Sequence, residues 1–230
     1  MREIILDTET TGLDPATGHR IVELGAVELL NHLPTGRSFH AYINPERDMP
    51  REAEAVHGLS AAFLSDKPVF AAIVSDFLAF IGDATLIIHN ASFDMAFLNA
   101  ELAFLGLPAL PPERVVDTLH LARQKHPGAA NSLDALCRRY GIDNSKRSKH
   151  GALLDSELLA EVYLELIGGR QTALILEASR VKRTTTVIAG PIDLQRPAPL
   201  PARLTEDERQ AHAAFVALLG DSALWRQGRA

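Results

Sequence analysis

Apolar positions in the first part of the chain come in short runs that are typical of β-strands. The runs are rich in β-branched or alternating apolar residues, and Gly, Pro and Asn lie between them. The predicted strands are residues 4–6, 21–30, 39–43 and 86–88. This part of the chain therefore predicts a sheet.

The apolar spacing changes to the helical repeat of three and four residues at other positions, beginning at residue 69. The predicted helices are residues 69–81, 93–105, 115–125, 132–140 and 152–167. Pro68 suits the first turn of the first helix, and Gly141 and Gly168 suit helix ends. Strands followed by helices predict an α/β domain that ends near Gly169.

The character of the chain changes after this domain. Four prolines between residues 191 and 201 follow a run of three threonines, which favours an extended linker over a packed element. Thr205 and Glu208 then form a Thr-x-x-Glu capping box, which predicts the start of a helix. We therefore predict a domain at residues 1–169, a linker at 170–204 and a helical tail at 205–230.

Composition limits the class of protein. The 230 residues are 47% hydrophobic, which is enough for one sizeable core with an appendage. No apolar run reaches the roughly 18 residues of a membrane span, and the chain opens on charged Arg2 and Glu3, unlike a secretory signal. We predict a cytoplasmic protein with no membrane partner. The single cysteine, Cys137, leaves no intrachain disulfide or cysteine zinc site, and we expect it in the core.

The net charge of −6 argues against a broad electrostatic grip on nucleic acid. The charge is unevenly distributed, however. Residues 1–169 hold 14 basic and 23 acidic residues, whereas residues 170–230 hold 9 basic and 6 acidic ones. An acidic domain is therefore followed by a basic tail.

Two carboxylates, Asp7 and Glu9, follow the first apolar run. Residues i and i+2 of a strand point to the same face, so these two side chains project together. Side-by-side carboxylates repel unless a proton or a cation lies between them, and Mg²⁺ or Mn²⁺ suits such oxygen ligands. Taken alone, the pair fits a solvated turn as well as a metal site.

Further candidates lie at the starts of two predicted helices. Asp94 follows an apolar strand through His89-Asn90-Ala91-Ser92, at the strand end where α/β folds gather function. Asp155 lies one turn into the last helix of the domain, among apolar neighbours, as a helix N-terminal acid or a ligand would. His150 precedes it by five residues, close enough to face the same site.

These residues and the stretches around them resemble a known family. "DTETTG", "VHGL", "HNASFD" and "NSLDALCRRYGIDNSKRSKHGALLDSELLAEVYL" together are similar to the DEDDh exonucleases, and among them to the proofreading exonucleases of bacterial replicases, across roughly residues 3–169. The resemblance implies a ribonuclease H-like α/β fold, with a mixed central sheet flanked by helices and followed by a flexible C-terminal tail.

The resemblance also implies a catalytic set. Four acids of the family hold two divalent ions, Mg²⁺ or Mn²⁺, that activate a water and clamp the scissile phosphate. Asp7 would touch both ions, Glu9 and Asp155 would support the side of the catalytic water, and Asp94 would support the leaving group. His150 would accept the proton of the water, because an imidazole with a pKa of about 6.5 is suited to that task near neutral pH.

Other residues match family positions that contact the substrate. Glu52 and His57 would contact the terminal nucleotide, the loop Thr10-Thr11-Gly12 would hold the 3′ end together with Asp7, Glu9 and Asp155, and His89 would support the site. A basic group near His150 fits either the DNA backbone or a solvated face, and we favour the DNA backbone. It comprises Arg138, Arg139, Lys146, Arg147 and Lys149.

The tail carries two candidate docking segments. Gln171, Leu174 and Leu176 resemble the peptides that insert into the bacterial sliding clamp, although a short hydrophobic piece of linker fits them as well. Phe215 and Leu219 lie on one face of the tail helix, and Trp225 follows it; by resemblance they would dock on the polymerase subunit. The tail helix could instead fold back on the domain. A small theta-like subunit is a further partner that the resemblance suggests.

The leading hypothesis is a 3′–5′ proofreading exonuclease that acts on a frayed or single-stranded DNA 3′ end. An RNA-trimming exonuclease is the alternative enzyme, because the catalytic motifs do not report the sugar. A non-catalytic bridge between clamp and polymerase is the alternative outside enzymes. All four acids and His150 are present, which argues against an idle bridge, and the linker and Trp-bearing tail favour DNA over RNA.

Overall fold

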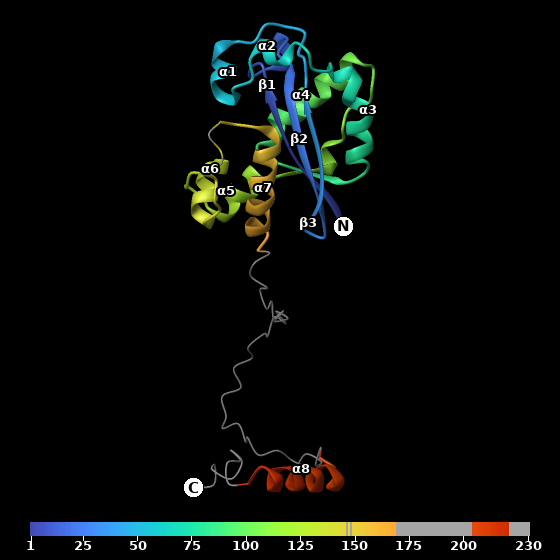
Figure 1. Cartoon of the computed structure of the whole chain (residues 1–230), viewed down its shortest axis with the longest axis vertical. Coiled ribbons are helices and arrows are strands. Elements are labelled where there is room, and N and C mark those ends of the chain that lie inside the picture. Colours follow the sequence, from blue (N-terminus) through green and yellow to red (C-terminus); the bar gives the residue numbers. More distant parts are fainter. Residues whose placement is uncertain (146, 148, 169–203, 221–230) are drawn as a thin grey trace, which may run out of the picture. The chain divides into compact units, whose positions relative to one another are not determined.

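A computed structural model gives the fold, and it describes residues 1–145, 147, 149–168 and 204–220. The chain divides into two units, Met1–Leu176 and Glu177–Ala230. No helix among the described residues has the length and apolar character needed to cross a bilayer. The first unit holds the sheet and seven of the α-helices described (Figure 1).

The first unit is built on a five-stranded mixed sheet with the strand order β3-β2-β1-β4-β5. β1 runs antiparallel to β2, and β2 antiparallel to β3, whereas β4 and β5 continue the sheet parallel to β1. The strands are β1 (Arg2–Thr10), β2 (Ile21–Leu30), β3 (Leu33–Tyr42), β4 (Thr85–Ile88) and β5 (Val115–Asp117). The predicted mixed sheet flanked by helices is confirmed.

Helices cover both faces of this sheet. α3 and α4 pack on one face, and α7 packs on the other with α5 and α6 beside it (Figure 1). The helices of the first unit are α1 (Arg51–His57), α2 (Ala61–Leu64), α3 (Phe70–Ile81), α4 (Ala91–Phe104), α5 (Thr118–Lys125), α6 (Leu133–Tyr140) and α7 (Ala152–Leu166). Short 3₁₀ turns lie at Pro15–Thr17 and Pro112–Arg114.

Alternation along β1 decides which helix each side chain meets. Ile4 and Leu6 enter the core beneath α3 and α4, whereas Ile5 packs against α7. Because side chains of a strand alternate between its faces, Asp7 and Glu9 share the α7 face, and Thr8 points toward α4. The Asp7 and Glu9 side chains of β1 therefore face α7, and the Thr8 hydroxyl faces α4.

Two sequence predictions need correction. Residues 115–125 form no single helix, because Val115 and Val116 pair with β4 as the edge strand β5 and Asp117 caps α5. The helices α1 and α2 were not predicted, since seven and four residues are too few for a helical repeat to stand out. Cys137 is fully buried, as expected.

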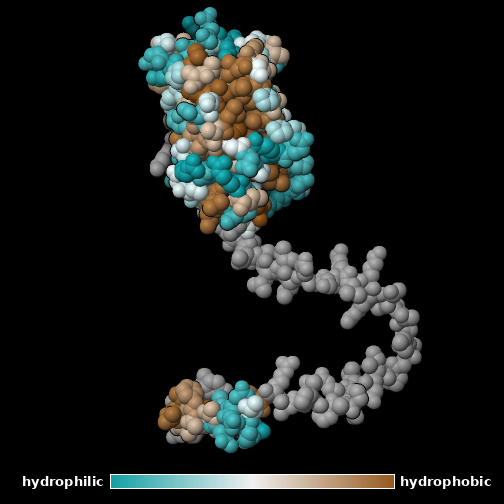
Figure 2. Space-filling model, turned by 90° about the vertical axis from the view of Figure 1, so that its right-hand side faces the viewer, coloured by the Kyte–Doolittle hydropathy of each residue, from teal (hydrophilic) through white to brown (hydrophobic). Residues whose placement is uncertain are grey.

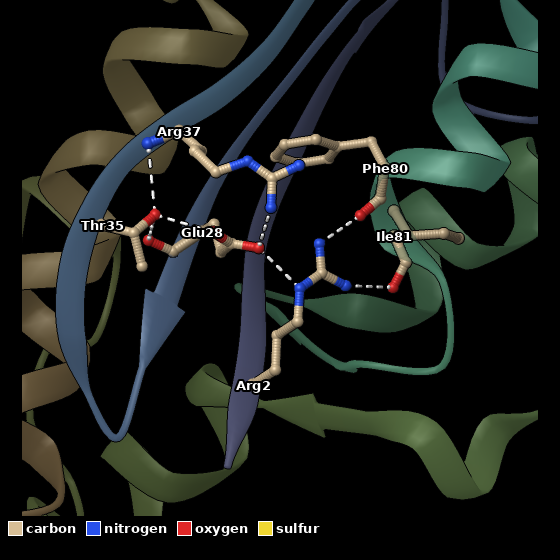
Figure 3. A network of polar contacts seen from close by, with 6 residues as sticks. All are labelled: Arg2, Glu28, Thr35, Arg37, Phe80 and Ile81. Carbon is tan, nitrogen blue, oxygen red and sulfur yellow. Dashed lines mark hydrogen bonds and ion pairs between the residues drawn. The ribbon is translucent and has the colours of Figure 1, made fainter.

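A polar network joins three strands to α3 at the end of the sheet opposite the predicted acids (Figure 3). Arg2 donates to Glu28 at 2.6 Å and to the carbonyls of Phe80 and Ile81, so it satisfies the last turn of α3. Arg37 and Thr35 on β3 donate to the same Glu28 at 3.0 and 2.8 Å. The network fixes the N-terminal end of β1, and with it the direction in which the strand presents its acids.

Gly25 of β2 is required for the approach of α7. A Cβ at this position would lie 2.2 Å from the backbone of both Ala152 and Leu153. Ser156 also donates to the Gly25 carbonyl at 3.0 Å, so the first turn of α7 lies directly on the strand. Gly25 pairs with Asp7 across β1 and β2, and the missing side chain brings α7 beside that acid.

The described part of the second unit contains the helix α8 (Glu206–Leu218). The predicted capping box is confirmed: the Glu208 N–H donates to Thr205 Oγ1, and the Thr205 N–H donates to the Glu208 carboxylate. Phe215 and Leu219 are exposed within this unit. Gln171, Leu174, Leu176 and Trp225 lie outside the described residues.

Candidate active site

The four predicted acids come together at the end of β1, brought there by three elements. Asp7 and Glu9 come from the strand itself, Asp94 from the first turn of α4 and Asp155 from the first turn of α7. Glu9, Asp94 and Asp155 are each less than one-tenth exposed, whereas Asp7 is partly open to solvent. Three carboxylates are thus held largely away from water, with the fourth open toward it.

Crowding of negative charge changes the ionisation of the cluster. Although one side of Asp7 is open, the surrounding protein removes much of the water from its carboxylate, which raises its pKa well above its ordinary range, and Asp94, Glu9 and Asp155 raise it further. Burial, followed by the charges of Asp155 and Glu23, raises the pKa of Glu9 to about 8. Without a cation, the cluster therefore holds protons near neutral pH.

Thr8 fixes the position of Asp94. Its backbone N–H and its hydroxyl both donate to Asp94 Oδ1, at 3.0 and 2.7 Å. These hydrogen bonds favour the charged carboxylate, but burial outweighs them and raises the pKa of Asp94 to about 7. The second oxygen of Asp94 takes no part in these two bonds.

Arg147 holds Asp155 and His150 together. Its guanidinium donates to the two oxygens of Asp155 at 2.5 and 2.6 Å, to Nδ1 of His150 at 2.8 Å and to Asp134 at 2.7 Å. Burial alone would raise the pKa of Asp155, but the nearby His150 and the bonds from Arg147 lower it below its ordinary value. Asp155 is therefore the acid of the cluster that is held as a carboxylate.

The donor set fits a divalent cation. Glu9, His150 and Asp155 each present one ligand atom, and these atoms lie within 4.8 Å of one another. Asp7 and Asp94 add carboxylate oxygens to the same place, and hard divalent cations prefer such ligands. The raised pKa of Asp7 points the same way, because a cation relieves the repulsion that now favours its protonation.

A hollow of about 550 Å³ lies beside Glu9. The predicted loop Thr10-Thr11-Gly12 forms one wall, and α1 forms another, with Glu52 and His57. The hydroxyl of Thr10 donates to the Gly12 carbonyl at 2.6 Å, and that of Thr11 accepts the Arg20 N–H at 3.0 Å. Both hydroxyls thus shape the loop from within.

The base of this loop is anchored to α4 by a buried ion pair. Arg20 donates twice to Glu101, at 2.7 Å each, and the Ile21 N–H adds a longer bond to the same carboxylate. Glu101 is almost fully buried, and breaking such a pair would leave its charge uncompensated. The wall of the hollow is therefore fixed to the helix that carries Asp94.

His57 lines this hollow and carries a buried polar atom. Its Nδ1 accepts the Leu59 N–H at 3.0 Å, which leaves the proton of the neutral ring on Nε2. Nε2 is buried and makes no hydrogen bond among the described residues. Burial lowers the pKa of His57, against the charge of Glu23 and the backbone of Thr10, so the neutral donor is favoured. Glu52 is exposed at the rim.

His89, which the sequence predicts to support the site, lies at the start of the turn that leads to Asp94. Its Nδ1 lies 2.9 Å from Thr118 Oγ1 at the start of α5. The next residue, Asn90, has a positive φ of 66°, which is uncommon outside glycine, and its N–H donates to Asp117 at 3.1 Å. Asp117 also caps α5. One carboxylate therefore fixes both the turn before Asp94 and the start of α5.

Two contributors to the site were missed by sequence reasoning. Glu23 lies opposite Glu9 across β1 and β2, is buried, and bonds His40 at 2.7 Å. Arg147 was assigned to DNA, yet it bonds Asp155. The signal for Glu23 was a charged residue inside the apolar run 21–30, while Arg147 gave no signal beyond its nearness in sequence to Asp155.

The remaining basic residues near His150 are spread out. Arg139 donates to the Ala130 carbonyl at 3.0 Å and contacts Asn131. The Lys149 side chain lies over Gly58, next to α1. Arg138 is exposed, and Lys146 lies outside the described residues. The described members of this group therefore lie in different surroundings, and their contact with the DNA backbone stays a prediction.

The fold and the acidic cluster define a nuclease, and residues 4–163 match the family model of the RNase T type, described as exonuclease. The chain belongs to this exonuclease family and is a metal-dependent 3′–5′ exonuclease. The DNA polymerase III subunit epsilon of Rickettsia felis is 51% identical to it over 219 residues, which are 94% of this chain and 96% of that protein. The DNA polymerase III subunit epsilon of Escherichia coli K12 is 44% identical over an alignment of 240 positions, which covers 98% of this chain and 97% of that protein.

Solved structures support the fold. Exonuclease X in complex with 5′ overhanging duplex DNA is 26% identical, with a TM-score of 0.59 over 73% of this chain and 92% of that one. The nuclease domain of 3′hExo, a DEDDh family member bound to rAMP, is 20% identical. Its TM-score is 0.64, over 73% of this chain and 92% of that one. The ribonuclease H-like exonuclease fold is thus confirmed.

Proposed function

We propose that this chain is the proofreading subunit of a bacterial DNA polymerase III, where it removes mispaired nucleotides from the 3′ end of DNA. The cluster of Asp7, Glu9, Asp94 and Asp155 at the end of β1 carries this proposal. Relatives of 44–51% identity over nearly the whole chain, which are DNA polymerase III epsilon subunits, support the assignment to replication.

The proposed site takes two divalent ions, Mg²⁺ or Mn²⁺, held by the four acids. When bound, such ions supply an activated water and stabilise the charge that develops on the leaving oxygen. Asp7 is near enough to each of the other three acids for their charges to raise its pKa, and it would serve both positions. Glu9 and Asp155 would hold the side on which water attacks, and Asp94, oriented by Thr8, would hold the leaving-group side.

Arg147 would orient Asp155 as a ligand. Its guanidinium bonds both oxygens of Asp155, and each oxygen keeps a second lone pair for a cation. The same guanidinium bonds Asp134 at 2.7 Å, which holds it in place. In this proposal Arg147 keeps Asp155 charged, and a turn of the His150 ring away from Arg147 frees its Nδ1.

His150 is the proposed base. It precedes α7 in an open loop, and its side chain is 48% exposed, so the ring can turn toward a water at the acids. A ring nitrogen freed from Arg147 can accept the proton of that water, and Asp155, 3.3 Å from Nδ1, stabilises the imidazolium that forms. The loop is tied to α1 by the bond from the His150 N–H to the Val56 carbonyl.

The hollow beside Glu9 is the proposed site of the terminal nucleotide. Leu13, Val56 and Phe93 line it with apolar surface that a base of any identity can contact. Nε2 of His57 supplies a buried donor for the nucleotide, and Glu52 lies at the rim. Apolar contact with little hydrogen-bond readout suits an enzyme that removes whichever base is wrong.

Partners beyond DNA are proposed from the tail and from one surface of the first unit. Phe215 and Leu219 of α8, with Trp225, would dock on the polymerase alpha subunit, and Gln171, Leu174 and Leu176 on the sliding clamp. Figure 2 shows apolar surface on the side of the first unit that carries α3, and a hollow of about 420 Å³ there is lined by Phe39, Ala41 and Ile73. A small theta-like subunit would fit this surface.

In this proposal the protein acts in the cytoplasm.

One experiment tests the function. The purified protein is given 3′-mispaired DNA, matched DNA and RNA of the same sequence, each with Mg²⁺ and with EDTA. We expect Mg²⁺-dependent release of nucleotides from the 3′ end, fastest on the frayed mispair and lost in EDTA and in Asp7→Ala. Faster cleavage of RNA than of DNA would favour RNA trimming over proofreading as the function. Wild-type activity of Asp7→Ala would refute the proposed catalytic role of the acid cluster.

A further inference from the structure

Two hollows flank the acids, and their linings differ in chemistry. The terminal-nucleotide hollow begins at Thr8 and Glu9 and is largely apolar. The second hollow, of about 860 Å³, begins at Asp7, Asp155 and His150 and extends between the His89–Asn90 turn, α5 and the start of α6. Its lining is mostly polar, with Arg123 on the α5 side. Such a lining suits a charged backbone better than a base.

The continuity of a DNA strand assigns this second hollow. The scissile phosphate has to lie at the acids, and the proposed function places the nucleotide on its 3′ side in the first hollow. The strand on its 5′ side then leaves from the opposite side of the acids. We propose that the second hollow binds the phosphodiester backbone 5′ of the scissile bond and that Arg123 contacts a phosphate there. This inference rests on the proposed function.

Arg123 is positioned by a buried part of α5. The neighbouring Ala122 is fully buried, and Thr118 at the start of the helix is fully buried and donates to the Ile88 carbonyl at 3.3 Å. Leu119, four residues before Arg123, lines the same hollow, so both lie on the helix face that borders it. Burial lowers the pKa of His89, and the charge of Arg123 lowers it further, which is consistent with the guanidinium being near that ring.

Arg123 is also a cation without a bound partner. It is exposed and makes no hydrogen bond or ion pair within the described part of the chain. Arg147, the other arginine of this hollow, is committed to Asp155 and Asp134. Asp134, the acid on the α6 side, forms an ion pair with Arg147 and accepts a hydrogen bond from the Asn144 amide at 3.1 Å. A phosphate entering the hollow would therefore meet Arg123 as its free positive charge.

Substrate length separates this inference from the function on which it rests. The full-length protein and Arg123→Gln are assayed on a 20-nucleotide single strand and on the p-nitrophenyl ester of thymidine 5′-monophosphate. The ester places a small leaving group where the 5′ strand would begin, so it fills the first hollow and the acids alone. Arg209→Gln is the matched control, because Arg209 is exposed on α8 and does not line the hollow. Circular dichroism checks that each variant folds.

For Arg123→Gln we expect kcat/KM on the 20-mer to fall about tenfold, as for loss of one charged hydrogen bond, and to stay within about twofold on the ester. The slope of log kcat/KM against log salt should become shallower by about 0.7, the value for one phosphate contact on a single strand. Arg209→Gln should change neither quantity, and Arg123→Lys should restore most of the slope.

An equal loss on ester and 20-mer would overturn the inference, because Arg123 would then act on the acids. An unchanged 20-mer rate or salt slope would overturn it as well, as would an equal effect of Arg209→Gln. If the wild-type protein cleaved neither substrate, the proposed function would fail instead.

Discussion

At the scale of single residues, the acids behave as a group whose members have different environments. Burial raises the pKa of Asp7, Glu9 and Asp94, and repulsion within the cluster adds to it at Asp7 and Glu9, whereas Arg147 and His150 lower the pKa of Asp155. The sequence predicted all four acids because each follows a short motif. It could not predict the bond between Arg147 and Asp155, or that between Arg20 and Glu101, because these depend on how loops and distant helices meet.

His150 offers a prediction at this scale. His150→Ala should lower the rate of single-turnover hydrolysis by about 100-fold or more, since general base catalysis contributes that much. Mn²⁺ binding measured by calorimetry should remain, because the four carboxylates are intact. The exposed His120→Ala serves as the control and should leave both quantities unchanged. Loss of Mn²⁺ binding in His150→Ala would make this residue a ligand instead.

At the scale of elements, the catalytic geometry depends on the contact between α7 and β2. The sequence predicted the bounds of α7 to within one residue, because the apolar repeat of this helix is long. The bounds of α3 and α6 were predicted equally well. It did not predict β5, since a three-residue strand gains its identity from pairing with β4, which no local pattern reports. The requirement for glycine at residue 25 likewise arises from a helix that lies far along the chain.

Gly25→Ala should therefore move α7 and the acid that it carries. A Cβ 2.2 Å from the helix backbone cannot be accommodated without displacement, and overpacking of this kind costs about 1–3 kcal/mol. We expect Tm to fall by several degrees and kcat to fall on the order of 100-fold, the cost of about 1 Å of misplacement.

Gly151→Ala is the matched control for Gly25→Ala. It precedes the same helix, but a Cβ there meets no atom within 4 Å. Scanning calorimetry and kcat should both remain near the wild-type values for this variant. Equal behaviour of the two alanine variants would contradict the close approach of α7 to β2.

At the scale of the whole molecule, the acids link stability to pH when cations are absent. Glu9 has a pKa of about 8 in the folded protein against about 4.5 when unfolded, so the folded state binds more protons between these values. Stability then falls as pH rises toward 8. The lowered pKa values of His57 and His89 act in the opposite sense below about 6.5, so the effect is cleanest between pH 6.5 and 8.

In EDTA, we expect the free energy of unfolding to fall as pH rises across this window. The fall should be on the order of 1 kcal/mol per pH unit for each proton that the folded state binds in excess of the unfolded state. That corresponds to roughly 2–4 °C in Tm. Thermal unfolding of wild type and of Glu9→Gln checks it, with a shallower dependence in the variant. Mg²⁺ should remove the fall, because cations bind the ionised carboxylates. A Tm that rose with pH in EDTA would contradict the raised pKa values.

The domain boundary gives a second prediction at this scale. A chain that ends at residue 169 should retain 3′–5′ exonuclease activity, since every site residue lies before it, and should no longer co-purify with the polymerase alpha subunit. Pull-down of both forms with that subunit measures this, and a full-length variant with Phe215→Ser and Leu219→Ser tests the α8 contact separately. Undiminished co-purification of the short chain would refute docking through the tail.

The course of α7 bears on how a partner could pull on this enzyme. Asp155 lies in its first turn, and Leu166 ends it, eleven residues or about 17 Å along the axis. Near that far end, Tyr163 donates to the buried Glu3 of β1 at 2.8 Å, and apolar side chains hold the helix to the sheet. If the tail docks on the polymerase as proposed, a force on the tail would reach α7 at this end, where these contacts hold the helix to β1, and not at the end that carries Asp155.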